Sequence, residues 1–166
     1  MTDRRLLFIA PSAYPLGGVA TWLDYLLPGL EEQGWEPALG LVVGRYHDPE
    51  QYLAGHPFHR VVRIENPTGS QEGRIRALCE TILSVDPAIV LSVNIPDVYL
   101  AMTRLRNRRK SRAKNVMTLH GIQSDLLGDA HAFREVLDAV ICTNRLTCQL
   151  VNETAGIAVD RIHYAP

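Results

Sequence analysis

Two adjacent glycines, Gly17 and Gly18, close the first loop of the chain and precede its first helix-like segment. Adjacent glycines let the backbone approach a ligand closely and adopt positive φ angles. A helix that starts behind them presents free N–H groups and a positive dipole end to a phosphate or to a developing negative charge. The alternative is that they only form a sharp turn. Neither G-x-G-x-x-G nor G-x-x-x-x-G-K-[ST] occurs, which argues against nicotinamide dinucleotide and P-loop sites.

His120 is the second candidate, because it directly follows an apolar run, residues 115–119, and precedes a glycine. A histidine in that place would lie at the rim of a ligand-binding crevice, facing the glycine loop. The alternative is a structural histidine at a strand end. The other five histidines show no metal-ligand spacing, and the three cysteines form no C-x-x-C pair, so we expect no metal and no redox cofactor. The apolar surroundings of the cysteines favour reduced thiols and a cytoplasmic protein.

Polar side chains also follow the apolar run at residues 87–93. Asn94 and Asp97 have the donors and acceptors that sugar hydroxyls require. Asp97 has an equally good structural explanation, because the first turn of a helix favours an acidic residue. Ser12 and Tyr14 in the first loop, and Asp125 shortly after His120, are further polar residues close to the expected strand ends.

These residues need a scaffold that gathers strand ends, and the rest of the sequence predicts one. Apolar runs alternate with segments of helical periodicity, which indicates an α/β domain with a doubly wound, Rossmann-like parallel sheet of about six to seven strands. In such sheets ligands bind at the carboxyl ends of the strands. The expected strands are 5–10, 37–43, 60–64, 87–93, 115–119, 139–142 and 162–165. The expected helices include 19–30, ended by Gly34, a short one at 133–137, and one capped by Asn144.

The composition argues against several other classes of function. The 166 residues suffice for one domain, and 46% hydrophobic and 21% charged residues are ordinary for a globular protein. The sequence predicts neither a signal peptide nor a transmembrane helix. The net charge of −1 gives no general reason to expect nucleic-acid binding.

Residues 104–114, however, contain seven basic residues and no acid: Arg104, Arg106, Arg108, Arg109, Lys110, Arg112 and Lys114. This stretch is either a solvated loop or a patch that docks peripherally on an anionic membrane; no aromatic residues interleave with it to stack on bases.

Four segments, in order, resemble the N-terminal domain of GT-B-fold retaining glycosyltransferases, the group 1 or family-four type. They are Gly17-Gly18 with the following Val-Ala-Thr-Trp-Leu, the segment Val116-Met-Thr-Leu-His120-Gly121, the segment Leu137-Asp-Ala-Val-Ile-Cys-Thr-Asn144, and Val159 to Pro166. They are similar to the family's "GG", "VxTxHG" and "ADxIIxxS" motifs and to the segment that leads to its interdomain hinge. Asn144 and Arg145 depart from the family's serine and acid, so no contact is inferred there.

The resemblance implies that residues 1–166 are the acceptor-side domain and that a C-terminal domain, expected as its partner, binds the nucleotide-sugar. It implies transfer of the sugar with retention, without a metal or another cofactor, to a sugar or lipid-linked acceptor, and an isolated domain that is inert. Gly17 and Gly18 match the loop over the donor phosphates and sugar, and His120 matches the catalytic histidine that contacts the donor sugar. Ser12, Tyr14, Asn94 and Asp125 are expected on the acceptor side. The alternatives are a non-catalytic sugar-binding or nucleotide-sugar-binding module and a nucleotide-sugar epimerase of the same fold.

Overall fold

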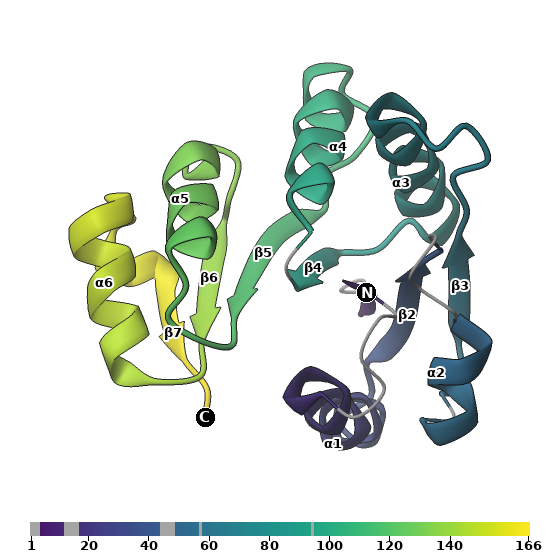
Figure 1. The fold of residues 1–166 in the computed structure, drawn as a ribbon, viewed down its shortest axis with the longest axis horizontal. Helices are drawn as coiled ribbons and strands as arrows, with labels where there is room; N and C mark the ends of the chain where they lie inside the picture. The colour runs from purple at the N-terminus through teal and green to yellow at the C-terminus, as the bar shows by residue number, and fades with distance from the viewer. Residues whose placement is uncertain (1–3, 12–16, 44–48, 57, 94) are drawn as a thin grey trace.

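The computed structural model describes residues 4–11, 17–43, 49–56, 58–93 and 95–166. Seven parallel strands form one sheet in the order β3-β2-β1-β4-β5-β6-β7 (Figure 1). The strands are β1 Arg5–Pro11, β2 Glu36–Val42, β3 Val61–Ile64, β4 Ile89–Val93, β5 Lys114–Leu119, β6 Ala139–Cys142 and β7 Ile162–Tyr164. The helices are α1 Gly18–Glu32, α2 Pro49–Gly55, α3 Gln71–Val85, α4 Pro96–Asn107, α5 Ser124–Phe133 and α6 Arg145–Ala155, and a 3-10 turn, Val159–Arg161, precedes β7.

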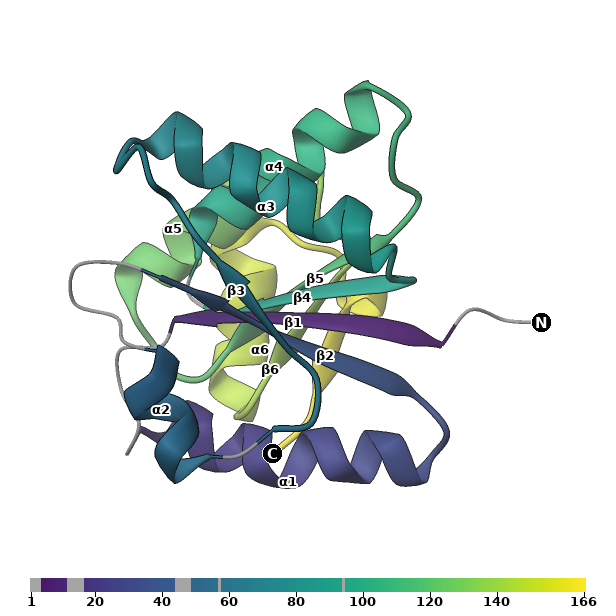
Figure 2. The same ribbon diagram turned by 90° about the vertical axis from the view of Figure 1, so that its right-hand side faces the viewer.

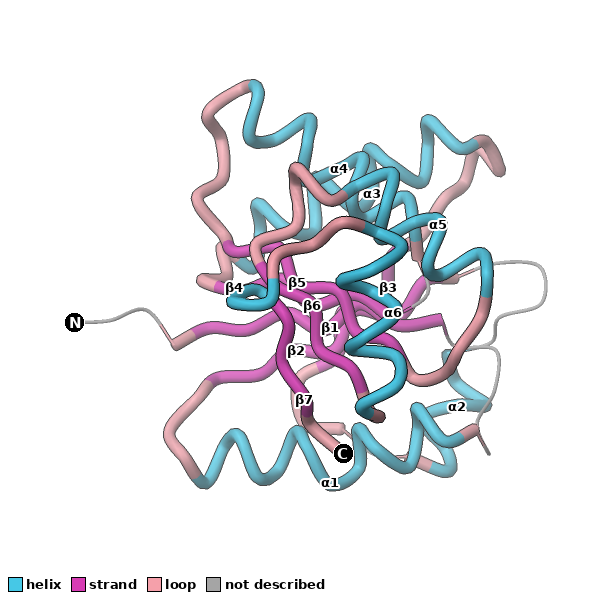
Figure 3. The backbone as a smooth tube through the Cα atoms, turned by 90° about the vertical axis from the view of Figure 1, so that its left-hand side faces the viewer, coloured by secondary structure: helices cyan, strands magenta, loops and turns pink. Residues whose placement is uncertain are grey.

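Helices cover both faces of the sheet, as Figure 2 shows for α3 and α4 on one side and α1 on the other. Alternate residues of β1 divide between the two faces. Leu7 and Ile9 belong to the core beneath α3 and α4, whereas Leu6 and Phe8 belong to the core beneath α1 and α2. A third cluster joins β5 and β6 to α5 and α6, and α6 lies beside the edge strand β7 (Figure 3). The predicted doubly wound parallel sheet is therefore confirmed.

Both predicted helix-end signals are confirmed. Gly34 has a φ of 78°, and the amides of Gly34 and Trp35 donate to the carbonyls of Glu31 and Leu30, which closes α1 in a Schellman motif. The Asn144 side chain accepts a 2.8 Å hydrogen bond from the Thr147 amide at the start of α6.

The helix expected at residues 133–137 was misplaced. The helix of this region is α5, Ser124–Phe133, and residues 134–138 form the turn that leads into β6. Leu126 and Ala130 are the buried positions of α5, one helical turn apart. Gly128 and two aspartates interrupt the apolar pattern, because this short helix buries only a narrow stripe.

The basic stretch proves to be partly structural. Arg104 makes a bidentate ion pair with Glu72, through two hydrogen bonds of 2.8 Å. Arg106 and Lys114 both pair with Asp138, whose carboxylate also accepts a 2.7 Å hydrogen bond from the Asn115 amide. Burial alone would raise the pKa of Asp138, but these hydrogen bonds and the Arg106 charge hold it below its usual value. The simple solvated-loop interpretation is therefore wrong for these three basic residues.

Lys114 is exposed although it pairs with Asp138, and four further basic residues of the stretch are exposed and make no ion pair among the described residues: Arg108, Arg109, Lys110 and Arg112. They lie where α4 ends and β5 is about to begin, which is the amino-terminal edge of the parallel sheet. They are thus at the opposite edge from the strand ends where a ligand crevice is expected. No helix in the described part of the chain has the length and apolarity needed to cross a membrane.

Candidate functional site

The strand order places a switch point between β1 and β4. These neighbouring strands pair in parallel, with Leu6 opposite Ile89 and Ile9 opposite Ser92. The chain leaves β1 toward α1 on one face and leaves β4 toward α4 on the other, so a crevice opens at their carboxyl ends. Of the predicted site residues near it, Ser12, Tyr14 and Asn94 lie outside the described residues.

The first turn of α1 has no side-chain cap among the described residues. Gly17 is the N-cap residue, and its carbonyl accepts a 2.9 Å hydrogen bond from the Ala20 amide. The first turn contains no acidic residue. A helix start of this kind favours an anion.

The expected reason for the two glycines needs correction. Gly17 has a φ of −81°, and Gly18 does not have a positive φ, so both conformations are open to other residues. What Gly18 provides is space, because a Cβ added there would meet no described atom within 4 Å. Gly18 therefore faces open space at the helix start, and neither glycine is needed for a left-handed turn.

His120 lies next to this helix start. Its ring packs against Trp22, one turn into α1, with centroids 4.6 Å apart and planes at 73°. Trp22 in turn contacts Phe8 of β1, with ring centroids 5.8 Å apart. Sequence positions about 100 residues apart thus meet on the α1 face of the sheet.

The imidazole of His120 has unused hydrogen-bonding capacity. Its Nε2 is buried and has no hydrogen-bond partner among the described residues. Burial lowers the pKa of His120, so the ring is neutral at pH 7. A neutral imidazole has one donor and one acceptor nitrogen, which suits it to a hydroxyl group of a ligand.

Asp97 stands on the other face of the crevice and is held by two partners. It is 8% exposed in the first turn of α4. One carboxylate oxygen accepts from Gln71 Nε2 at 2.9 Å and the other from Arg74 Nε at 2.7 Å. The interpretation of Asp97 as a residue of a first helical turn is confirmed, and its carboxylate positions Arg74.

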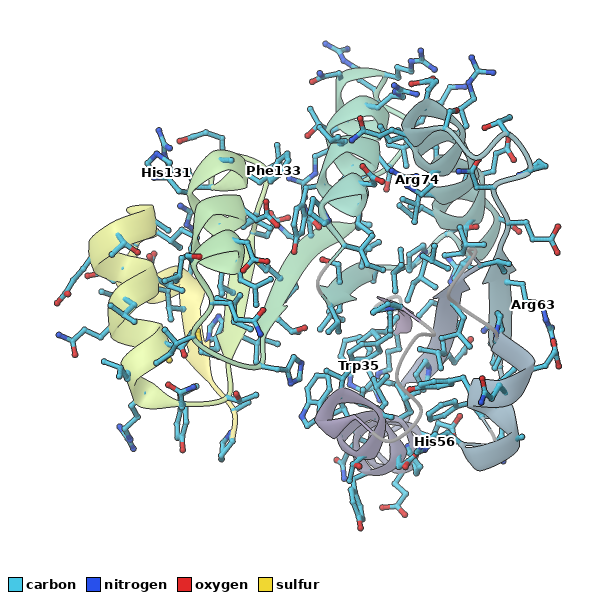
Figure 4. The ribbon with its side chains drawn as sticks, in the orientation of Figure 1. Trp35, His56, Arg63, Arg74, His131 and Phe133 are labelled. Carbon is cyan, nitrogen blue, oxygen red and sulfur yellow. The ribbon has the colours of Figure 1, made fainter. Side chains whose placement is uncertain are left out.

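A cavity of about 220 Å³ lies beside this pair, at the carboxyl ends of β1, β2 and β3. It is lined by Pro11, Val42, Ile64, Asn66, Arg74, Leu78, Ile95 and Asp97. Figure 4 shows Arg74 between α3 and α4. The sequence interpretation missed Asn66 and Arg74. The turn signal Asn66-Pro-Thr-Gly-Ser70 marked the place, but nothing local indicated that a cavity would form there.

The remaining predicted residue, Asp125, follows His120 in the chain, at the start of α5. It is exposed in the first turn of α5, and its charge adds to the effect of burial in raising the pKa of Asp129. No hydrogen bond joins it to His120 among the residues the structure describes. In the same described ranges, no group of three or more histidine, cysteine or acidic side chains is arranged to hold a metal ion.

No protein-family model and no curated protein matches the sequence. Solved structures match its fold. A glycosyltransferase from Rickettsia africae is 17% identical, with a TM-score of 0.67 over 99% of this chain and 43% of that one. The lipopolysaccharide outer core galactosyltransferase WaaB is 11% identical, with a TM-score of 0.73 over 98% and 46%. UDP-GlcNAc 2-epimerase from Neisseria meningitidis, bound to UDP-GlcNAc, is 9% identical, with a TM-score of 0.71 over 96% and 46%.

The chain thus spans less than half the length of each of these three proteins. Its fold is that of an N-terminal GT-B domain, as the resemblance predicted. Identities this low establish the fold alone.

Proposed function

We propose that this chain is the acceptor-side domain of a retaining glycosyltransferase that moves a sugar from a nucleotide-sugar donor to an acceptor. The observation that carries the proposal is His120, whose buried Nε2 lacks a partner among the described residues while its ring packs against Trp22, one turn into α1. The donor phosphates would lie at the uncapped start of α1, over Gly17 and Gly18. His120 would bind a hydroxyl of the donor sugar.

This arrangement suits the charges that develop during sugar transfer. The acceptor oxygen forms a bond to the anomeric carbon of the donor, and the bond from that carbon to the phosphate oxygen breaks. Negative charge grows on the departing nucleoside diphosphate, and the positive end of α1 would stabilise it. The acceptor hydroxyl proton leaves with the diphosphate. The nucleotide itself would be bound by a second domain, a partner supported by the share of the solved chains that this chain covers. Neither a metal nor another cofactor is required in this scheme.

A nucleotide-sugar epimerase is the second candidate. Solved epimerases match the fold with TM-scores of 0.65–0.72, and the two glycosyltransferases match it with TM-scores of 0.67 and 0.73. An uncapped helix start and a neutral histidine suit a nucleotide-sugar in either reaction. The reactions differ in the bond that changes: transfer makes a new glycosidic bond, whereas epimerisation changes a ring carbon of the sugar.

The test uses the protein expressed from its natural gene at full length. It is incubated with a panel of nucleotide-sugars and candidate acceptors and followed by phosphorus and proton NMR. We expect release of nucleoside diphosphate together with a glycoside whose anomeric configuration equals that of the donor. A sugar with an altered ring carbon and no glycoside would favour the epimerase. Donor binding without turnover would favour a binding module.

A further inference from the structure

We propose that the cavity beside Arg74 binds the acceptor through an anionic group, a phosphate or carboxylate, carried on a small apolar body. This inference rests on the proposed function only where it identifies the ligand as the acceptor. The binding site itself follows from the cavity. The cavity lies on the α3 and α4 face of the sheet, across the strand ends from His120.

The lining of the cavity has an apolar part and a polar part. Five of its eight residues are apolar: Pro11, Val42, Ile64, Leu78 and Ile95. At roughly 30 Å³ for each non-hydrogen group, about 220 Å³ holds roughly seven such groups. That is less than the roughly 300–1,000 Å³ of a site for a drug-sized ligand. The occupant is therefore a single ring, a short chain or the end of a larger molecule.

The polar side of the cavity offers hydrogen-bond donors. Arg74 uses its Nε on Asp97, and no hydrogen bond among the described residues uses its two terminal nitrogens. Both oxygens of Asp97 are occupied, by Gln71 and by Arg74. The Asn66 amide is also engaged, since its Nδ2 donates to the Ser70 carbonyl and its Oδ1 accepts from Thr68.

A group that accepts hydrogen bonds and donates none fits this side best. Carboxylate and phosphate oxygens accept from an arginine in a bidentate manner, and Asp97 fixes the plane of the guanidinium before a ligand arrives. The side chain of Arg74 is 40% exposed, so the terminal nitrogens are within reach of a ligand. A neutral sugar hydroxyl would gain less, because it carries no negative charge to pair with the guanidinium.

The test is a titration of the full-length protein with hexyl phosphate, followed by isothermal calorimetry and by methyl NMR of the isoleucines and leucines. Inorganic phosphate and hexan-1-ol serve as controls, because each carries only one of the two parts of hexyl phosphate. We expect hexyl phosphate to bind at least tenfold more tightly than either, and to shift the methyl signals of Ile64, Leu78 and Ile95. Equal affinity for inorganic phosphate would overturn the apolar part of the inference, and equal affinity for hexanol would overturn the anionic part.

Substitutions locate the site. Arg74→Gln should weaken hexyl phosphate binding at least tenfold, whereas Arg76→Gln, on the same helix but 72% exposed and paired with Glu72, should not change it. If Arg74→Gln does not fold, the wild-type methyl shifts decide, because binding that leaves Ile64, Leu78 and Ile95 unmoved overturns the site. Sugar transfer that proceeds without hexyl phosphate binding would refute this inference alone. Probe binding by a protein that transfers no sugar would refute the proposed function alone.

Discussion

The imidazole of His120 and the indole of Trp22 meet in a T-shaped contact, with ring centroids 4.6 Å apart. The contact joins the residue after β5 to α1, one turn into the helix, and so fixes the position of His120 relative to the helix start.

Replacing His120 by Ala should lower the turnover of the full-length enzyme by roughly 10²- to 10³-fold, which is typical for loss of one positioned hydrogen-bonding group. The measurement is kcat with the donor identified in the NMR screen, beside a thermal melt. His131→Ala is the matched control, because His131 is exposed on α5. Turnover near the wild-type value in a folded His120 variant would remove this residue from the reaction.

Acid should destabilise the wild-type protein partly through His120. Because burial lowers its pKa in the folded state, the unfolded chain takes up the proton first as the pH falls. Stability from this group is complete above the ordinary histidine pKa of about 6.5 and is lost as the pH falls below it. Urea unfolding at pH 7.5 and at pH 5.5 should therefore show a larger loss for the wild type than for His120→Gln. Equal losses would show that the folded state does not perturb this histidine.

Gly73→Ala should destabilise the fold by about 1–3 kcal/mol. A Cβ at this position would overlap Thr68 Oγ1 and Asn66 Oδ1, and the amide of Gly73 is the donor to the N-cap Ser70 at 3.0 Å. Chemical denaturation measures the change. Gly128→Ala is the control, because it lies in α5 with no atom within 4 Å of the added Cβ, and it should stabilise by about 0.5–1 kcal/mol. Similar changes in the free energy of unfolding for the two variants would contradict the tight packing around Gly73.

Vesicles rich in anionic lipid should sediment the protein at low salt through the four exposed basic residues Arg108, Arg109, Lys110 and Arg112. At about 1 kcal/mol for each, changing all four to Gln should weaken binding by roughly 10²- to 10³-fold. Arg60→Gln, an exposed change beside β3, should have little effect. Absence of sedimentation at low salt would mean that these residues only solvate the loop.

The elements whose signals are local could be predicted from the sequence. The buried strands have continuous apolar runs because both faces of the sheet are covered, and Gly34 and Asn144 mark helix ends by their own backbone and side-chain chemistry. The place of His120 at a strand end followed from the same runs. Helix α5 was missed because only two of its residues, Leu126 and Ala130, are buried.

The cavity could not be predicted for a different reason. Ile64, Leu78 and Ile95 come from three separate elements, and the hydrogen bond between Arg74 and Asp97 joins positions 23 residues apart. Their meeting depends on β1 lying between β2 and β4, an order that no local pattern contains. Likewise, Arg104 is an unremarkable basic residue until α3 brings Glu72 beside it.

The contact of His120 with Trp22 has an optical consequence. The protein contains two tryptophans, Trp22 and Trp35, and only Trp22 makes a ring contact with His120 among the described residues. An imidazolium quenches indole fluorescence more strongly than a neutral imidazole does, so the emission of Trp22 reports the protonation of its neighbour. In a Trp35→Phe background, one intrinsic fluorophore would therefore follow both acid titration and the arrival of a ligand at the crevice, without any attached dye.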